Sequence, residues 1–358
     1  MNNKAVIAMS GGVDSSVAAY LMKQRGFDCI GVTMKLFANE DIGISREHSC
    51  CSLDDVEDAR SVAYSLDMPY YVFNFSDRFE TDVIDRFIHA YENGITPNPC
   101  IDCNRYLKFD KLYMRAKELD RDYVVTGHYA RVEKDENGRF LLKKALDDTK
   151  DQSYVLYCLT QEQLSHTIFP LGEMRKSQAR EIAESQGFIN ASKADSQDIC
   201  FVQNGSYADF IEQYTGKNYP DGDFLDTNGN VIGRHKGVIR YTVGQRKGLG
   251  ISAPEPLYVK AVNPVSNTVT LSYNDGLYSS VVKAGDINLI SVPEIKGEMR
   301  VKAKVRYRHT EQWATVTQNG ETLTAVFDEP QRAVTCGQAL VLYDGDTVVG
   351  GGTIIEVE

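Results

Sequence analysis

Residues 5–16 read AVIAMSGGVDSS, and this stretch decides the fold of the first part of the chain. A short apolar run meets two glycines, and the residues that follow carry helical spacing that lasts until Gly26. The pattern therefore predicts a strand, a tight loop and a helix. Glycines let the backbone approach a ligand closely, and a helix N-terminus offers N–H groups and a positive dipole to an anion. We expect a phosphate group to bind here.

The loop also carries three hydroxyls and a carboxylate. Ser10, Ser15 and Ser16 add donors, while Asp14 either helps to hold a metal-bound pyrophosphate or caps the helix. The stretch lacks the lysine of a Walker A loop and the G-x-G-x-x-G spacing of a dinucleotide site, which argues against both motifs. SGGVDSS instead resembles the PP-loop of the ATP pyrophosphatases, which split ATP into AMP and pyrophosphate while activating a carbonyl oxygen. The alternative is an ordinary strand-to-helix turn.

Bulk composition is that of a globular protein with more than one domain. The chain has 358 residues, and single cores seldom grow beyond about 250–300 residues, so two or three domains are expected. No signal-like N-terminus and no apolar run of membrane-spanning length is present, which predicts a soluble, cytoplasmic protein. The net charge of −11 argues against broad non-specific nucleic-acid binding but leaves room for a local basic face.

Strands and helices alternate through the first 200 residues. Further strands are expected at 29–34, 70–75 and 123–126, with helices at 52–66 (capped by Ser52), 77–91, around 104–116 and 176–186. This alternation implies a parallel sheet covered on both faces, with ligand loops at the carboxyl ends of its strands. Met34 closes the second strand and Gly127-His128 follows the fourth, so both positions are expected to line the nucleotide pocket. A core methionine and a structural histidine are the alternatives.

Residues 94–105, GITPNPCIDCNR, form the second informative stretch. Two prolines are expected to keep the chain out of a helix until Cys103 or Asn104, which would put Cys103 near a helix N-terminus with Arg105 close by. Both features lower the pKa of a thiol, so a thiolate nucleophile is predicted. The C-x-x-C spacing with Cys100 also fits a redox pair, half of a metal site, or two small buried residues.

The remaining cysteines differ in their surroundings. Cys200 lies in a polar, loop-like stretch, which favours a reachable thiol. Cys29, Cys158 and Cys336 lie in apolar stretches and are expected to pack in the core. The Cys50-Cys51 pair is not assigned.

From about residue 206 the sequence changes to short alternating strands between Gly, Asn and Asp turns. Strands are expected at 252–262, 268–272, 299–307 and 339–343, which predicts two small barrels or sandwiches. The predicted domains are therefore 1–205, 206–282 and 283–358, with a boundary near Val282. The fold class is an α/β N-terminal PP-loop domain with a parallel sheet, followed by two small all-β domains.

Basic residues gather in the β half in two groups. Arg234, His235, Lys236, Arg240, Arg246 and Lys247 form the first, and residues 302–309 the second. Strand alternation would place Lys302, Lys304, Arg306 and Arg308 on one face, a stripe suited to a phosphate backbone. A solvated strand face is the alternative.

Several motifs together resemble the bacterial tRNA-specific 2-thiouridylases, the MnmA family. They are SGGVDSS, NPCIDCNRYLKF, TGHYAR, KDQSY, DSQDICF, YTVGQRKGLG, VRYRH and the terminal GGGTIIE. They cover nearly the whole chain in the order of the family, whose fold is a PP-loop domain followed by two β domains. The resemblance implies ATP-dependent exchange of oxygen for sulfur at C2 of the wobble uridine in certain tRNAs.

The resemblance also implies roles for individual residues. A sulfur-carrier protein would load Cys200 as a persulfide, and Cys103 would react with it to free the sulfur, leaving a Cys103–Cys200 disulfide to be reduced. The ATP-binding residues would be Ala8, Met9, Ser10, Gly11, Gly12, Val13, Asp14, Ser15, Met34 and Gly127. The chemistry of ATP itself, rather than the resemblance, suggests that Mg²⁺ accompanies it. The tRNA contacts would be Asn98, Pro99 and Cys100 at the target base, with His128, Lys150, Asp151, Gln152, Arg306, Tyr307 and Gln338.

One position departs from the family. Many members have Asp where this chain has Cys100, so the acid–base role proposed for that Asp is open, with Asp102 as a substitute. Cys100, Cys103 and Cys200 form a three-thiolate set that fits an iron–sulfur cluster with one open iron, an alternative route to tRNA thiolation. A small-molecule PP-loop synthetase, which would need neither Cys103 nor Cys200, is a weaker hypothesis, as is a non-catalytic RNA-binding protein.

Overall fold

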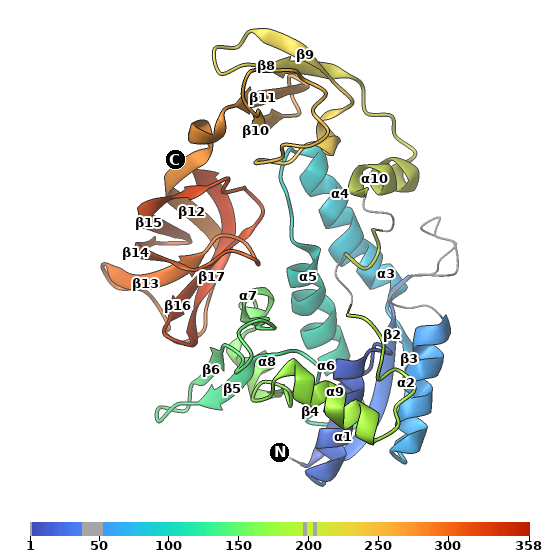
Figure 1. Cartoon of the computed structure of the whole chain (residues 1–358). Coiled ribbons are helices and arrows are strands. Elements are labelled where there is room, and N and C mark those ends of the chain that lie inside the picture. The colour runs from blue at the N-terminus through green and yellow to red at the C-terminus, as the bar shows by residue number, and fades with distance from the viewer. Residues whose placement is uncertain (1, 38–52, 196–198, 203–205) are drawn as a thin grey trace. The chain divides into compact units, whose positions relative to one another are not determined.

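The computed structural model describes residues 2–37, 53–195, 199–202 and 206–358 (Figure 1). Ser52, Cys50, Cys51 and residues 196–198 of the DSQDICF motif lie outside the described residues. The chain forms two compact units, and each consists of several segments that are separate in the sequence. The first contains residues 1–83, 99–205 and 345–349; the second contains 84–98, 206–344 and 350–358.

A parallel five-stranded sheet forms the centre of the first unit. Its strands, in spatial order, are β3 (Tyr70–Asn74), β2 (Asp28–Lys35), β1 (Lys4–Ala8), β4 (Tyr123–Val125) and β7 (Thr167–Ile168). Every neighbouring pair is parallel. Ala5, Val6 and Ile7 are consecutive in β1 and all have 0% exposure, so both faces of the sheet are covered. The predicted parallel α/β sheet is confirmed.

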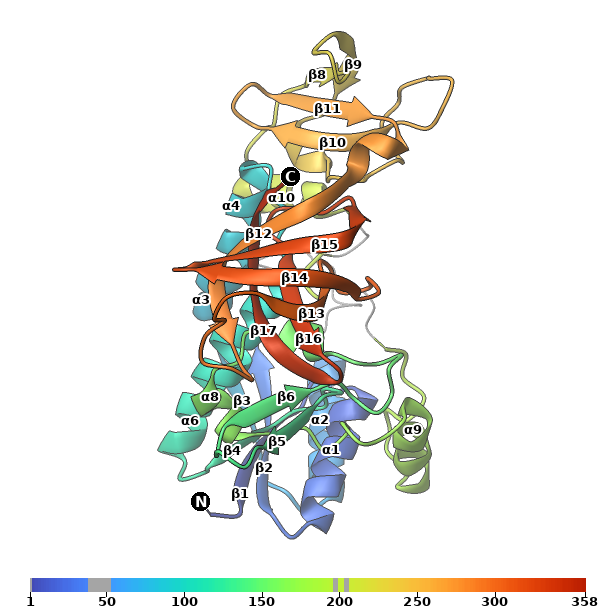
Figure 2. The same ribbon diagram turned by 90° about the vertical axis from the view of Figure 1, so that its left-hand side faces the viewer.

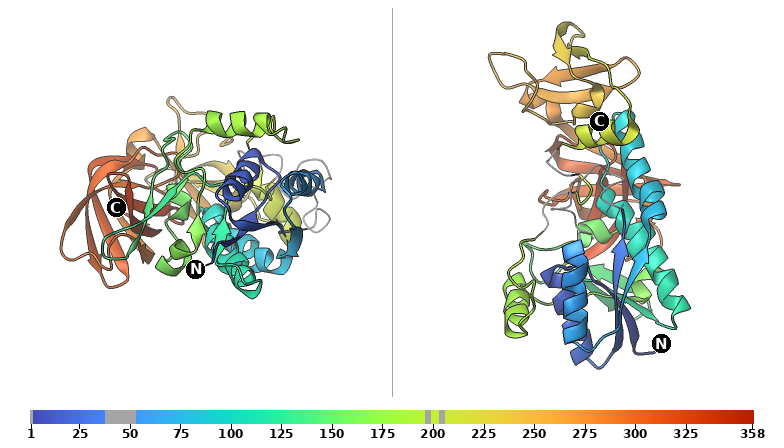
Figure 3. Two further views of the ribbon diagram at one scale, coloured as in Figure 1. Left: turned by 90° about the horizontal axis from the view of Figure 1, so that it is seen from below. Right: turned by 90° about the vertical axis from the view of Figure 1, so that its right-hand side faces the viewer.

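Helices cover the two faces of this sheet. Helices α1 (Val13–Gln24), α2 (Leu53–Ser65) and α9 (Lys176–Ser185) share one apolar core with β1 and β2, and Figure 3 shows α1 beside α2. Helix α6 (Leu112–Glu118) packs against β4. The first unit also contains a hairpin of β5 (Arg131–Lys134) and β6 (Phe140–Lys143), and the short helices α7 (Ser153–Leu156) and α8 (Gln161–Ser165).

Two expected helices contain wide π-helical turns. The first consists of α3 (Ser76–Phe79), the π segment Glu80–Ile84 and α4 (Asp85–Glu92). The second consists of α5 (Pro99–Asp102), the π segment Cys103–Lys111 and α6. The expected start near Cys103 is therefore wrong. Proline fits the first turn of a helix because its missing N–H has no intrahelical partner there, so the helix begins at Pro99. Cys103 consequently lies one turn inside it.

A small four-stranded sheet begins the β half, in the second unit. It follows helix α10 (Tyr207–Thr215), and its spatial order is β10 (Tyr258–Asn263), β11 (Thr268–Ser272), β8 (Gly222–Leu225) and β9 (Val231–His235). Only β8 and β11 pair in parallel among these strands. The strand expected from Ser252 begins at Tyr258 instead, because Pro254 and Pro256 lack the N–H that a ladder needs. Short 3₁₀ turns occupy Val238–Arg240 and Asn274–Leu277.

Six strands close into a barrel at the end of the chain (Figure 2). They are β12 (Tyr278–Leu289), β13 (Met299–Lys304), β14 (Gln312–Asn319), β15 (Thr322–Arg332), β16 (Ala339–Asp344) and β17 (Thr347–Val357). Antiparallel pairing of β12 with both β15 and β17 completes the circuit. Val282, Ala303, Val316 and Leu323 lie inside with 2% exposure or less. Val282, the expected domain boundary, lies within β12. The predicted α/β domain followed by all-β domains is confirmed.

Among the described residues, no helix has both the length and the apolar character needed to cross a membrane.

Gly11 and Gly12 offer a matched test of how the loop is held. Gly11 has φ +75°, and an added Cβ would lie 2.4 Å from the carbonyl oxygen of Asp55, whereas a Cβ on Gly12 would have only Ser10 Oγ nearby, at 3.7 Å. We expect Gly11→Ala to lower the free energy of unfolding by about 2–4 kcal/mol. Gly12→Ala should change it by less than about 1 kcal/mol. Urea unfolding of both variants tests this, and equal stabilities would contradict it.

Candidate active site

The loop after β1 folds back on its own backbone. The hydroxyls of Ser15 and Ser16 both donate to the carbonyl of Gly12, at 3.0 and 3.1 Å. The N–H of Ser10 donates to the Ser15 oxygen at 3.3 Å. Asn190 donates to the Gly11 carbonyl and to the Ser16 oxygen, both at 2.9 Å. These bonds occupy carbonyls and hydroxyls of the loop, and the first-turn N–H groups of α1 have no intrahelical partner, as an anion site requires.

Neighbouring strand ends meet this loop. An added Cβ on Gly127 would lie 2.7 Å from the carbonyl carbon of Asp14 and 2.8 Å from the nitrogen of Ser15, so only glycine fits there. Met34 is half-buried next to the end of β2. The preceding residue, Thr33, donates its hydroxyl to the carbonyl of Met9 at 2.6 Å. The structure thus brings Gly127 against the loop and keeps Met34 on the strand beside it.

Two lysines that sequence reasoning missed contact this loop. Lys193 binds Asp55 at 2.5 Å, Asp58 at 2.7 Å and the carbonyl of Gly11 at 3.3 Å. Lys176 binds both carboxylate oxygens of Asp14 at 2.8 Å. Asp14 is therefore held by an ammonium rather than acting as a helix cap. Neither lysine follows a glycine in a P-loop pattern, so only the fold could reveal them.

Cys103 is a buried thiol. Its exposure is 8%, and this burial raises its pKa, an effect that the nearby Lys108 ammonium partly opposes. The expected lowering of the pKa by a helix N-terminus and by Arg105 is wrong. The helix starts four residues earlier, and Arg105 acts on Cys158 instead, where burial still raises the pKa to about 11. Cys103 is thus a protonated thiol near neutral pH.

The other cysteines fall into exposed and buried sets. Cys100 is exposed on α5, and Cys200 is partly exposed next to Phe201, whose buried ring packs on Phe79 with centroids 5.6 Å apart. Cys29, Cys158 and Cys336 are buried or half-buried. All of these are thiols rather than disulfides. Within the described ranges, no three His, Cys, Asp or Glu side chains converge as metal ligands, so the three-thiolate set of the alternative hypothesis is not assembled there.

His128 is buried at 9% exposure and packs beside two aromatic rings. Its Nδ1 lies 2.7 Å from the hydroxyl of Thr126, and the rings of Phe109 and Phe169 are each 6.0 Å away. Burial, with a smaller contribution from Lys108, holds its pKa well below the usual value. The imidazole is therefore neutral at pH 7.

Several residues expected at a tRNA surface are engaged by the chain itself. Lys150 forms an ion pair with Asp195 at 2.9 Å. Asp151 accepts the N–H groups of Ala145 and Ser153, and Gln152 accepts the N–H of Tyr129 at 2.9 Å.

In the second unit, Arg306 donates to the carbonyl of Arg332 at 3.3 Å, and Tyr307 is 39% exposed. Gln338 donates to the carbonyls of Thr96 and Pro97 at 2.9 and 3.2 Å. Asn98 follows directly, before Pro99 begins α5.

The prediction of a four-residue basic stripe is wrong for two of its residues. Strand β13 ends at Lys304, so Arg306 and Arg308 lie in the turn that follows and do not continue its alternation. Lys302 and Lys304 share one face and lie over the rings of Trp313 and Tyr343, each at 5.6 Å.

The first basic group is partly neutralised within the second unit: Arg234 pairs with Asp223, and Arg240 with Asp209 and Glu212.

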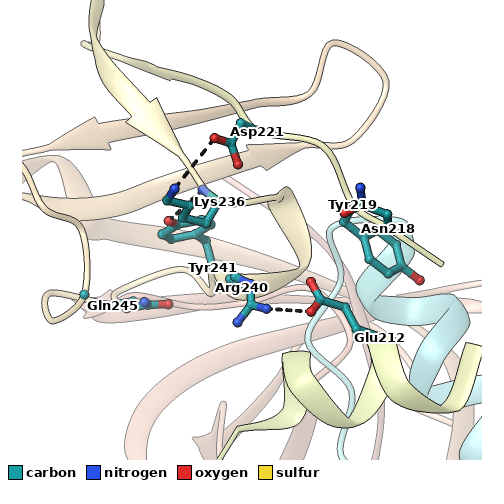
Figure 4. Close-up of a pocket in the computed structure, with 9 residues that line it drawn as sticks. Glu212, Asn218, Tyr219, Asp221, Lys236, Arg240, Tyr241 and Gln245 are labelled. Atoms are coloured by element: carbon teal, nitrogen blue, oxygen red, sulfur yellow. Dashed lines mark hydrogen bonds and ion pairs between the residues drawn. The ribbon is translucent and has the colours of Figure 1, made fainter. Parts of the chain in front are cut away.

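A cavity of about 530 Å³ lies in the second unit (Figure 4). Its lining residues are Glu212, Asn218, Tyr219, Asp221, Lys236, Arg240, Tyr241, Gln245 and Gly248. Arg240 pairs with Glu212 at 2.7 Å across it, and Lys236 reaches Asp221 at 3.8 Å. Neither a cysteine nor a loop residue of the ATP-binding stretch lines it, so it is separate from the predicted chemistry.

The fold is that of an α/β protein with a parallel sheet and a glycine-containing loop after its first strand, extended by all-β domains. Three family models match in sequence: the tRNA methyl transferase HUP domain over residues 3–204, the tRNA methyl transferase PRC-barrel domain over 208–273, and the aminomethyltransferase beta-barrel domain over 279–354. The chain is 52% identical to the tRNA-specific 2-thiouridylase MnmA of Clostridioides difficile, covering 99% of this chain and 98% of the relative. It belongs to the tRNA-specific 2-thiouridylase family.

Other relatives agree with this assignment. The enzyme of the same name from Lachnoclostridium phytofermentans is 51% identical, with 99% of both chains covered. Among solved structures, a 4-thiouridine synthetase in complex with RNA and ATP matches 60% of this chain and 50% of its own, at 20% identity and a TM-score of 0.37. An NMN synthetase from Francisella tularensis matches 61% of this chain and 79% of its own, at 18% identity and a TM-score of 0.35. Both scores are too low to add to the assignment.

The raised pKa of Cys103 predicts a pH-dependent reactivity. Only the thiolate is alkylated, so below the pKa the rate should rise about tenfold per pH unit. Removing the Lys108 ammonium raises the pKa further, and Lys108→Met should therefore slow alkylation of Cys103 about two- to fivefold at pH 7.5. Mass spectrometry after timed exposure to iodoacetamide measures this. Lys111→Met, on the same helix, is the control; a rate independent of pH and of Lys108 would contradict the burial argument.

Gln338 should fix the segment that leads into α5. Loss of its two hydrogen bonds, at about 0.5–1.5 kcal/mol each, should speed exchange of the Thr96 N–H roughly tenfold in Gln338→Ala. This N–H donates to the carbonyl of Cys336 at 3.0 Å, so it reports directly on the segment. Gln318→Ala, which removes a comparable barrel amide, is the control. Unchanged exchange at Thr96 would show that the amide does not hold this segment.

Proposed function

We propose that this protein catalyses ATP-dependent 2-thiolation of the wobble uridine of tRNA, as a tRNA uridine 2-sulfurtransferase. The observation that carries this proposal is identity of about half the residues with tRNA-specific 2-thiouridylases over the whole chain. The PP-loop and the pair of thiols, Cys103 and Cys200, are the chemical groups that such a reaction needs. The proposed place of this reaction is the cytoplasm.

The first proposed step activates the uridine. ATP, entering as its magnesium complex, lies on residues 8–15 with Met34 and Gly127 beside it. The C2 oxygen of the base attacks the α-phosphorus, and pyrophosphate leaves with the electron pair of the broken P–O bond. The oxygen, a poor leaving group, becomes part of AMP. N–H groups at the start of α1 stabilise the charge on the departing phosphates.

The second step delivers sulfur. A persulfide-bearing donor protein loads Cys200 with one sulfur atom, and the terminal sulfur attacks C2 while AMP leaves. The Cys103 thiolate then attacks the sulfur of Cys200. The S–S bond breaks, its electron pair stays on the tRNA sulfur, and 2-thiouridine is released. Cys103 and Cys200 are left as a disulfide, which a dithiol reductant must reduce before the next turnover.

Cys103 must lose its proton to react. Burial raises its pKa, so the thiol is stable until a base or a change of surroundings removes the proton. Lys108 favours the thiolate electrostatically. The buried state protects Cys103 from oxidation.

The target base must leave its stack for this chemistry. Asn98, Pro99 and Cys100 are proposed to face it, with His128 in its neutral form nearby. Cys100 replaces the Asp of many family members, so the acid–base role passes to Asp102 or is dispensable. Lys150, Asp151, Gln152, Arg306, Tyr307 and Gln338 are proposed to contact or support the tRNA. The three-domain division at 205 and 282 remains a prediction.

The decisive experiment compares three cysteine variants. We expect Cys103→Ala and Cys200→Ala to lower 2-thiouridine formation at least a hundredfold, because each removes a sulfur that changes bonds. Cys100→Ala should retain activity within about fivefold. The assay uses unmodified tRNA, ATP and a persulfide donor with anaerobically purified protein, and iron is quantified in parallel.

The outcomes separate the mechanisms. Loss of product in all three variants, with iron tracking activity, would replace the persulfide mechanism by the iron–sulfur one. Activity without Cys103 or Cys200 would overturn the assignment of the pair. Absence of any ATP turnover by the wild type in the presence of tRNA would overturn the proposed function.

A further inference from the structure

One buried ammonium joins two carboxylates beside the ATP loop. Nζ of Lys176 lies 2.8 Å from each carboxylate oxygen of Asp14 and 2.7 Å from Oδ1 of Asp195. The Lys176 side chain is only 10% exposed. A lysine this deeply buried is expected to be paired, because an unpaired buried charge is costly. Here it is paired twice, by residues far apart in the sequence.

The two carboxylates come from different functional stretches. Asp14 belongs to the first turn of α1, within the proposed ATP loop. Asp195 lies beyond α9, five positions before Cys200. Lys176 itself is the first residue of α9, and its N–H donates to Asp147 at 2.9 Å. All of these residues belong to the first unit.

Further groups surround this bridge. Tyr129 donates its hydroxyl to Asp14 at 2.8 Å. Lys150 and Arg180 bind Asp195 at 2.9 and 3.1 Å. Burial alone would raise the pKa of Asp195, but Lys150 and Lys176 outweigh it and hold that pKa at about 2, so the carboxylate stays ionised. Three cations thus meet two carboxylates, and Lys176 is the one of the three that touches both.

Removing this ammonium would leave two like charges facing each other. Bonds of 2.8 and 2.7 Å to one nitrogen place the bridged oxygens of Asp14 and Asp195 at most about 5.5 Å apart. Repulsion at this distance in a partly buried site is strong, and a polyanionic triphosphate arriving at the same loop would add to it. With Lys176 present, the loop meets ATP with these charges neutralised.

We infer that Lys176 is a positioning residue for ATP, which neutralises Asp14 and ties the ATP loop to Asp195. The inference rests on the proposed use of residues 8–15 as the ATP site. This role is distinct from that of Lys193, which binds the Gly11 carbonyl of the loop and two carboxylates of helix α2. It also explains how the carboxylate of Asp14 can lie within a loop that binds phosphate.

The test compares a variant that lacks the Lys176 ammonium with one that also lacks the Asp195 carboxylate. The variants are Lys176→Met, Lys176→Met combined with Asp195→Asn, and Lys283→Met as a control. Lys283 also bridges two carboxylates, Glu356 and Glu358, but on the β barrel. Calorimetric titration with ATP and filter binding with unmodified tRNA measure the two affinities, and thermal melting shows whether each variant is folded.

The expected result is selective. Lys176→Met should weaken ATP binding at least tenfold and leave tRNA affinity within twofold. The double variant should recover at least threefold of the ATP affinity, since the second carboxylate no longer repels the first. The control should match the wild type. A purely structural role would lower both affinities together with melting temperature, without recovery, and would overturn the inference, as would unchanged ATP binding in Lys176→Met.

The proposed function fails separately. Wild-type protein that binds ATP in a Lys176-dependent way but forms no 2-thiouridine would contradict the function and leave the positioning role standing. Wild-type protein that forms 2-thiouridine while Lys176→Met keeps full ATP affinity would do the reverse.

Discussion

At two points, the first turn of α1 and the loop before it pack too closely against neighbouring backbone for any residue but glycine. The rest of the candidate active site depends on this close packing. The end of β4 meets the backbone of Asp14 and Ser15 at Gly127, and the loop meets Asp55 of α2 at Gly11. Asn190 and Lys193 then fix the Gly11 carbonyl. The loop's shape is thus imposed by the elements around it.

Burial favours the uncharged form of both Cys103 and His128. It raises the pKa of Cys103 and lowers that of His128, and Lys108 is a neighbour of both. By contrast, the charged groups Asp14, Asp195 and Lys176 neutralise one another through direct contacts. The first unit therefore contains buried neutral groups and, apart from them, a cluster of paired charges.

Local patterns predicted the elements whose causes are local. The run at residues 5–9 gave β1 within one residue, and the strand at 268–272 appears with the expected limits. The helix around Cys103 was misplaced because Pro99 permits a helix start that a breaker rule forbids. The pKa of Cys103 and the partners of Lys176 could not be predicted, since both depend on burial and on contacts between segments far apart in the sequence. The stripe expected at residues 302–308 failed because nothing in the alternation marks the end of β13 at Lys304.

The two compact units do not follow the order of the chain, which passes between them after residues 83, 98, 205, 344 and 349. Helix α4 illustrates what this means, because it lies early in the sequence but packs with helix α10 of the second unit. Its Phe87 and Tyr91 contact Phe210 and Tyr207, with ring centroids 6.4 and 4.4 Å apart. A gene fragment that ends near residue 204 would leave both rings without these partners. Residues 84–98 therefore belong to the packing of the second unit, although most of that unit follows more than 100 residues later in the chain.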